Sequence, residues 1–193
     1  MIYCTSDWHF NHDKPFIYEP RGFPSVEEMN EAIIERHNSI VKQGDVVYCL
    51  GDCCLGGGGE DILNENKKLI ERLNGQIHII RGNHCTNKRV NMYKTCSNVI
   101  ECEQYVIILK YRKYNFYLSH YPTITSNGEF KSLHQVTCNL FGHTHSKALF
   151  YEGVPYIYNV ALDAHNCFPV SLDTIIDDMK DFMNKTNCTL ITK

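Results

Sequence analysis

The chain has 193 residues, of which 43% are hydrophobic, 21% are charged and 11% are aromatic. A chain of this size and composition can bury a substantial core, which excludes an intrinsically disordered protein and predicts one globular domain. Its formal net charge of −3 offers no overall basic surface for nucleic-acid phosphates, so we expect no sequence-specific nucleic-acid binding.

The first part of the chain alternates between strand and helix patterns. Three short apolar runs predict strands, and they cover residues 1–5, 46–50 and 76–81. Ser25 and Glu28 form a capping box ahead of apolar residues at helical spacing, which predicts a helix over residues 25–41. A second amphipathic helix is expected over residues 60–73. The irregular loop over residues 6–24 fits neither periodicity, and we expect it to overhang the functional site.

From Asn98 onward the sequence pattern changes to runs rich in Tyr, Ile and Val, separated by short turns. These runs predict mostly antiparallel strands, which cover residues 105–111, 115–119, 137–141, 148–152 and 156–162. A last helix is expected over residues 172–184, with Ser171 as its N-cap. Together the two halves predict a protein of the α/β class.

The cysteines and the apolar runs bear on the location of the protein. Ten cysteines could form a secreted disulfide scaffold, but the opening residues lack the basic and apolar regions of a signal peptide, so we expect reduced thiols and a cytoplasmic protein. Cys4, Cys49 and Cys138 fall in predicted strands, where a free cysteine packs as a small hydrophobic residue. No apolar run reaches the roughly 20 residues of a membrane-spanning helix, so no membrane partner is expected.

Five apolar runs are followed by residue types that bind metal ions. In chain order these residues are Asp7 and His9, then Asp52, then Asn83, then His120, and finally His143 and His145. Parallel strands deliver their carboxyl ends to the same edge of a sheet, so side chains that are distant in sequence can meet there around an ion. A single histidine is more often structural than a ligand, but the combined pattern favours a metal site.

The same residues resemble the motifs of the calcineurin-like metallophosphoesterase family. The matching blocks are D-x-H at Asp7 to His9, G-D at Gly51 and Asp52, G-N-H at Gly82 to His84, a lone His120, and G-H-x-H at Gly142 to His145. All five occur in order over nearly the whole chain, and the opening S-D-x-H-F-x-H is similar to a small phage and bacterial subgroup. The resemblance implies one domain over residues 1–193, folded as a four-layer α/β/β/α sandwich with mixed sheets.

The resemblance also implies two divalent metal ions, which we expect to be Mn, Fe or Zn because the ligands offer nitrogen and oxygen but no thiolate. The implied ligands are Asp7, His9 and His145 for the first ion, Asn83, His120 and His143 for the second, and Asp52 as the bridge between them. Two such ions activate a bridging water for in-line attack on phosphorus. The implied reaction is hydrolysis of a phosphodiester or phosphomonoester by a metal-bridging hydroxide, with nucleotides and cyclic nucleotides among the possible substrates.

Three further residues are candidates for contact with the substrate. His84 is implied to be the catalytic imidazole, which stabilises the transition state or protonates the leaving oxygen. The family usually has Asp or Glu at the next position, whereas this chain has Cys85, which would support a charged imidazole poorly. His12 could contact the substrate or a ligand, and Arg21 could bind a substrate phosphate through two N–H groups; for each, an ordinary loop residue is the alternative.

Two other functional classes remain as alternatives. A non-catalytic interaction scaffold on the same fold would be favoured by loss of several ligands or of His84, and the sequence retains them all. Purely structural ions fit less well, because structural sites are usually closed, have four ligands and are rich in cysteine. We therefore expect a phosphate-ester small molecule or a nucleotide as the partner.

Overall fold

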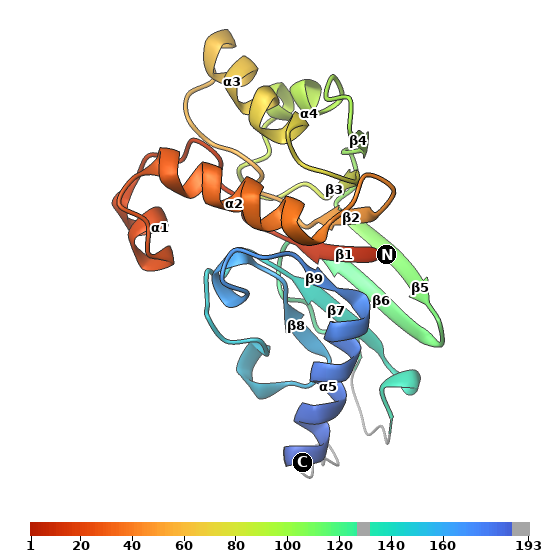
Figure 1. The fold of residues 1–193 in the computed structure, drawn as a ribbon. Coiled ribbons are helices and arrows are strands. Elements are labelled where there is room, and N and C mark those ends of the chain that lie inside the picture. Colours follow the sequence, from red (N-terminus) through yellow and green to blue (C-terminus); the bar gives the residue numbers. More distant parts are fainter. Residues whose placement is uncertain (127–131, 187–193) are drawn as a thin grey trace.

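The computed structural model describes residues 1–126 and 132–186. Two β-sheets form its centre, with helices α2 to α4 beside the first sheet and helix α5 beside the second (Figure 1). The first sheet has the order β4-β3-β2-β1-β9. Its strands are β1 (Ile2–Thr5), β2 (Val46–Cys49), β3 (Gln76–Ile79), β4 (Val99–Glu101) and β9 (Val170–Ser171). Strands β1 to β4 are parallel and β9 pairs antiparallel with β1, so the three expected N-terminal strands are confirmed in a mixed sheet.

The second sheet has the order β5-β6-β7-β8. Its strands are β5 (Val106–Tyr111), β6 (Tyr114–Ser119), β7 (Thr137–Phe141) and β8 (Ile157–Asn159). Strands β5 and β6 form an antiparallel hairpin, but β6 pairs parallel with β7, and β7 pairs parallel with β8. The expectation of mostly antiparallel strands is therefore wrong, because the connections after β6 and β7 carry the chain back before the next strand starts.

One expected strand of this half is absent from both sheets. Residues 148–152 were expected to be extended, but the chain forms a 3₁₀ helix over Tyr151–Gly153. Only Phe150 pairs with the sheet, through an isolated antiparallel bridge to Tyr158. Glu152 has φ of 48°, which is incompatible with a continuous strand.

The long helices start where the sequence predicts. Helix α2 spans Val26–Ile40, and the Ser25 hydroxyl accepts a hydrogen bond from the Glu28 N–H at 3.2 Å. Helix α3 spans Glu60–Glu71. Helix α5 spans Leu172–Thr186, and its expected N-cap, Ser171, accepts from the N–H of Thr174 at 3.1 Å. None of the helices within the described ranges is long and apolar enough to cross a membrane.

Two short helices lie in segments where the sequence shows no periodicity. Helix α1 (Pro15–Tyr18) begins with a proline and lies within the loop that was expected to be irregular. Helix α4 (Asn87–Tyr93) follows β3 and is capped by the Thr86 side chain. Helices of one or two turns contain too few apolar repeats to be recognised from spacing alone.

The apolar side chains divide into two cores. One lies between the first sheet and the helices beside it, and it includes Met29, Ile33, Val47 and Ile77. The other joins the two sheets and helix α5, and it includes Leu50, Ile80, Phe116, Leu140 and Ile175. Because both sheets share the second core, their strand ends are held next to each other.

The nine described cysteines are buried free thiols, as expected for Cys4, Cys49 and Cys138. Burial raises the pKa of Cys138 to about 12, because the thiolate would lose its hydration. The tenth cysteine, Cys188, lies outside the described residues. These thiols therefore act as apolar packing groups.

Candidate metal centre

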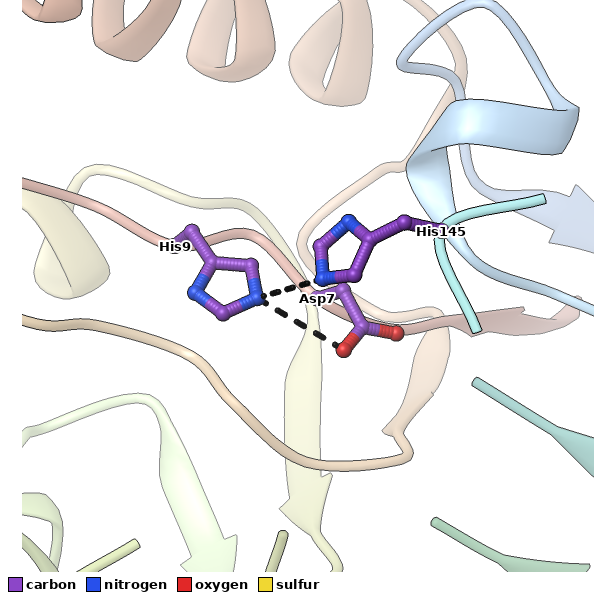
Figure 2. A group of neighbouring side chains, drawn as sticks. All are labelled: Asp7, His9 and His145. Carbon is purple, nitrogen blue, oxygen red and sulfur yellow. Dashed lines mark hydrogen bonds and ion pairs between the residues drawn. The ribbon is translucent and has the colours of Figure 1, made fainter. Parts of the chain in front are cut away.

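Three of the expected ligands meet at the carboxyl end of β1, as Figure 2 shows. The Nε2 atoms of His9 and His145 are 3.1 Å apart, and His9 Nε2 is 3.7 Å from Asp7 Oδ1. Asp7 is fully buried and His9 is almost so. Two imidazole nitrogens and one carboxylate oxygen thus face a common point, which is the arrangement of ligands around a cation.

The other expected ligands form a second group at the ends of β2, β3, β6 and β7. The amide oxygen of Asn83 lies 2.8 Å from His120 Nε2 and 3.0 Å from His143 Nδ1. His120 Nε2 also lies 3.3 Å from Asp52 Oδ2. One carboxylate, one amide oxygen and two imidazoles therefore converge on a second point.

The two groups are adjacent. One ligand atom from each of Asp7, Asp52 and His120 lies within 4.8 Å of the other two, so Asp7 belongs to the first group and also borders the second. The Asp7 Oδ2 atom accepts a hydrogen bond from the N–H of His143 at 2.8 Å. The structure thus places all seven predicted ligands in one cluster.

The chemistry of the cluster fits bound cations. Asp7 Oδ1 is buried and has no hydrogen-bond partner among the described residues, although it faces two imidazoles. Burial raises the pKa of Asp7, so this carboxylate needs a nearby positive charge to remain ionised. Burial would raise the pKa of Asp52, but the combined effect of the nearby His120 imidazole and the hydrogen bond from the His84 N–H holds that pKa below its ordinary value.

Hydrogen bonds fix which nitrogen each imidazole can offer. His120 Nδ1 lies 2.8 Å from the carbonyl oxygen of Leu50 and must donate to it, which leaves the Nε2 lone pair directed at Asp52 and Asn83. His145 Nδ1 lies 3.0 Å from Asp163 Oδ2, which leaves its Nε2 directed at His9. A carboxylate or carbonyl behind a ligating histidine is the usual support for a metal site.

Most of the ligands have left-handed backbone. The φ angles lie between 50° and 68° for Asp7, His9, Asp52, His143 and His145. Non-glycine residues rarely adopt this region, and Asp and His are among the residues that enter it more often. Such conformations cost about 1–3 kcal/mol each and persist where the surrounding structure enforces them. At these five positions the chain turns sharply, and each of the five side chains faces the cluster.

Glycines allow the strand ends to approach this closely. A Cβ atom on Gly51 would lie 2.7 Å from His120 Nδ1, and one on Gly82 would overlap the Asp52 carboxylate. A Cβ atom on Gly142 would overlap Ser6 and the Asp7 carboxylate. The glycine in each of these motifs therefore provides room for a ligand.

Replacing Gly142 by alanine should disturb the first group of ligands. The added methyl group must displace Asp7 or Ser6, so we expect a loss of about 1–3 kcal/mol in unfolding free energy, together with weaker metal binding. Gly44→Ala is the matched control, because a Cβ atom there meets nothing within 4 Å. Thermal unfolding and metal content would be compared for both variants, and equal behaviour of the two would contradict the close-approach role of Gly142.

His84 lies beside the first group without belonging to it. Its ring centroid is 5.8 Å from that of His9, and the ring is partly exposed. The polar contacts recorded for His84 involve its backbone: its N–H donates to Asp52 at 2.8 Å, and its carbonyl accepts from Arg89. Cys85 is buried, and burial raises the pKa of its thiol, so it supplies no negative charge to the imidazole.

His12 lies next to a predicted ligand. Its Nδ1 atom is 3.3 Å from Nδ1 of His9, and its ring centroid is 6.3 Å from that of His84. Burial lowers the pKa of His12 to about 4. A neutral imidazole in this position can support His9 or contact a substrate, so both expectations for His12 remain open.

The placement of Arg21 corrects one expectation. Its side chain is 1% exposed, and its guanidinium forms an ion pair with Asp163 at 2.8 Å rather than facing the cluster's open side. The role of a substrate-phosphate clamp is therefore wrong for Arg21, because a buried and fully hydrogen-bonded group has no free N–H to offer.

Asp163 is a site residue that the search for ligands missed. It lies in a 3₁₀ helix over Leu162–Ala164 and touches His145. The apolar run over residues 156–162 ends in this aspartate, which is the same pattern that singled out the ligands. This pattern is the feature of the sequence from which Asp163 could have been identified as a site residue.

A comparison with models of protein families identifies the family of this chain. The family model described as calcineurin-like phosphoesterase matches residues 1–185. The chain belongs to the calcineurin-like phosphoesterase family. An uncharacterized protein of Methanocaldococcus jannaschii is 34% identical over 183 residues, covering 91% of this chain and 89% of that protein.

A solved structure has the same fold. The crystal structure of a protein of unknown function from Aquifex aeolicus superposes with a TM-score of 0.65, covering 91% of this chain and 97% of that one at 20% identity. This likeness confirms the α/β fold with two mixed sheets. Membership of the calcineurin-like phosphoesterase family supports a metal-dependent activity on phosphate esters.

Proposed function

We propose that this calcineurin-like phosphoesterase is a binuclear enzyme that hydrolyses a phosphodiester or a phosphomonoester. The observation that carries the proposal is the adjacency of two ligand groups, with Asp7, Asp52 and His120 within 4.8 Å of one another. A single closed site would need only four ligands. Seven nitrogen and oxygen ligands in one cluster suit two divalent ions, for which we propose Mn, Fe or Zn.

The proposed division of ligands follows the two groups. The first ion would be held by Asp7, His9 and His145, and the second ion by Asn83, His120 and His143. Asp52 would bind both ions. When bound, the two ions would lower the pKa of a water molecule and neutralise charge on the phosphoryl group. The protein's own contribution is to hold the ligands in place through the left-handed strand ends and the hydrogen bonds behind His120 and His145.

His84 is the proposed acid or transition-state stabiliser. Its partly exposed ring lies beside His9 and His12, so it can reach a phosphate ester that is bound above the cluster. The next residue in the chain is Cys85 rather than a carboxylate, and its buried thiol carries no negative charge. The proton for the leaving oxygen would come from this ring.

The test of this function is hydrolysis by the purified protein. We expect turnover of bis-p-nitrophenyl phosphate or p-nitrophenyl phosphate with added Mn²⁺, its loss with a chelator, and its recovery when metal is restored. A screen that includes nucleotides and cyclic nucleotides would then identify the substrate class. Absence of turnover with each of Mn²⁺, Fe²⁺, Zn²⁺, Co²⁺ and Ni²⁺ would contradict an enzymatic role and would favour the alternative of an interaction scaffold.

A further inference from the structure

Arg21 and Asp163 form a deeply buried ion pair near the metal cluster. Their side chains are 1% and 7% exposed, although the two residues are far apart in the sequence. Arg21 ends a 3₁₀ helix over Glu19–Arg21, and Asp163 lies in another over Leu162–Ala164. The pair thus ties the loop after β1 to the segment after β8.

Every N–H group of Arg21 is used within the protein. Two of them donate to Asp163: Nε to Oδ1 at 3.1 Å and Nη2 to Oδ2 at 2.8 Å. Nη2 also donates to the carbonyl oxygen of Asp7 at 2.8 Å, and Nη1 donates to the carbonyl of Trp8 at 3.3 Å. A longer contact from Nη1 to the sulfur of Met29 accounts for the fifth N–H group. Arg21 therefore holds the backbone at a predicted ligand and the side chain of Asp163 together.

Asp163 continues the chain of contacts to the cluster. Its Oδ2 atom accepts from Arg21 and lies 3.0 Å from Nδ1 of His145. Both carboxylate oxygens of Asp163 accept hydrogen bonds from Arg21, so this group faces His145 as an acceptor. An ionised carboxylate in this position keeps the proton of His145 on Nδ1 and leaves the Nε2 lone pair free.

We propose that Arg21 and Asp163 form a positioning pair for the first metal site, acting on Asp7 through its backbone and on His145 through its tautomer and orientation. The proposal rests on the metal centre proposed above. Neither residue belongs to either group of proposed ligands. Their contacts end on two of the three first-group ligands, and they leave the second group untouched.

Stability alone explains this pair poorly. The desolvation of two buried charges offsets most of their attraction, so replacing a buried ion pair by apolar residues is often neutral or stabilising. A positioning role accounts for the buried charges. The bidentate ion pair fixes the planes of the Arg21 guanidinium and the Asp163 carboxylate, and the carboxylate in turn orients the His145 ring. Arg21 also donates to the carbonyl oxygen of Asp7, where φ is 60°.

The first test is metal affinity, which is independent of catalysis. Metal-stripped protein would be titrated with Mn²⁺ by calorimetry, and we expect two sites in the wild-type protein. Asp163→Asn should weaken one of them by about 10–100-fold and leave the other unchanged. Asp173→Asn is the matched control, because Asp173 forms an ion pair with Arg112 at 3.0 Å on the surface, and it should bind both ions as the wild type does.

A second variant tests whether a loss of metal affinity is caused by misfolding. Asp163→Asn leaves the buried charge of Arg21 without its partner, which could unfold the protein. The double variant with Arg21→Met and Asp163→Asn removes both charges, and it should fold while keeping the same weakened site. Binding of both ions with wild-type affinity by this folded double variant would overturn the proposal.

A mutant cycle separates positioning from general destabilisation. In a His145→Ala background the first site is already impaired, so adding Asp163→Asn should cause no further loss of Mn²⁺ affinity if Asp163 acts through His145. Equal losses in the two backgrounds would overturn the role of Asp163. A wild-type protein that binds none of Mn²⁺, Fe²⁺ and Zn²⁺ would overturn the metal centre, and the positioning pair with it, whereas two bound ions without hydrolysis would contradict only the enzymatic function.

Discussion

Asp52→Asn should release metal and reduce phosphoester hydrolysis to the level of the metal-free protein. One carboxylate oxygen of Asp52 lies within 4.8 Å of ligand atoms of Asp7 and His120, so in the proposed centre its negative charge would offset the repulsion between two cations. Asparagine has nearly the same shape and can still accept the N–H of His84 through its amide oxygen. The variant therefore removes the charge while the local backbone contact is retained.

Metal content and turnover of the Asp52 variant would be measured on the same preparation. Asp61→Asn is a suitable control, because Asp61 is exposed in the first turn of helix α3. The control should retain both ions and full activity. Two bound ions and wild-type turnover in Asp52→Asn would show that this carboxylate is not the bridge.

His84→Gln should have the second-largest effect, and it should spare metal binding. The ring of His84 is not among the ligand atoms of either group, so both ions should remain. Loss of a general acid lowers kcat by about 10²–10⁴-fold. The loss should be smaller for p-nitrophenyl esters than for alkyl esters, because p-nitrophenolate leaves without being protonated.

The comparison of leaving groups distinguishes the two roles suggested for His84. A similar loss with aryl and alkyl esters would indicate that the imidazole stabilises charge on the phosphoryl group and donates no proton. His78→Gln is the matched control, since His78 lies within β3 and its ring stacks near Tyr48. Metal loss in His84→Gln as large as in Asp52→Asn would contradict the assignment of His84 as a residue that binds no metal.

Local signals in the sequence predict the features that depend on a few neighbouring residues. Ser25 and Glu28 form the capping box of a helix that starts at Val26. The ligand types follow apolar runs, and the parallel register of β1, β2 and β3 brings their ends together. Both patterns need only residues that are close in the chain and the known geometry of parallel strands.

Features that depend on distant residues could not be predicted in this way. The parallel pairing of β6, β7 and β8 is set by long connections whose direction no local pattern records. The contact that occupies Arg21 joins it to Asp163, which is 142 positions away in the chain, so the arginine looked available for a phosphate. The left-handed φ angles of Asp52 and His143 became visible only in the folded chain.

The left-handed backbone of the ligands has a consequence for engineering and for evolution. Glycine at Asp7 or His143 would relax the main chain, so a screen for thermostability alone should favour substitutions at positions that we propose to bind the ions. Selection for a more robust fold and selection for chemistry therefore act in opposite directions on the same few residues. A lineage that no longer needed the reaction would be free to exchange these side chains and gain resistance to heat.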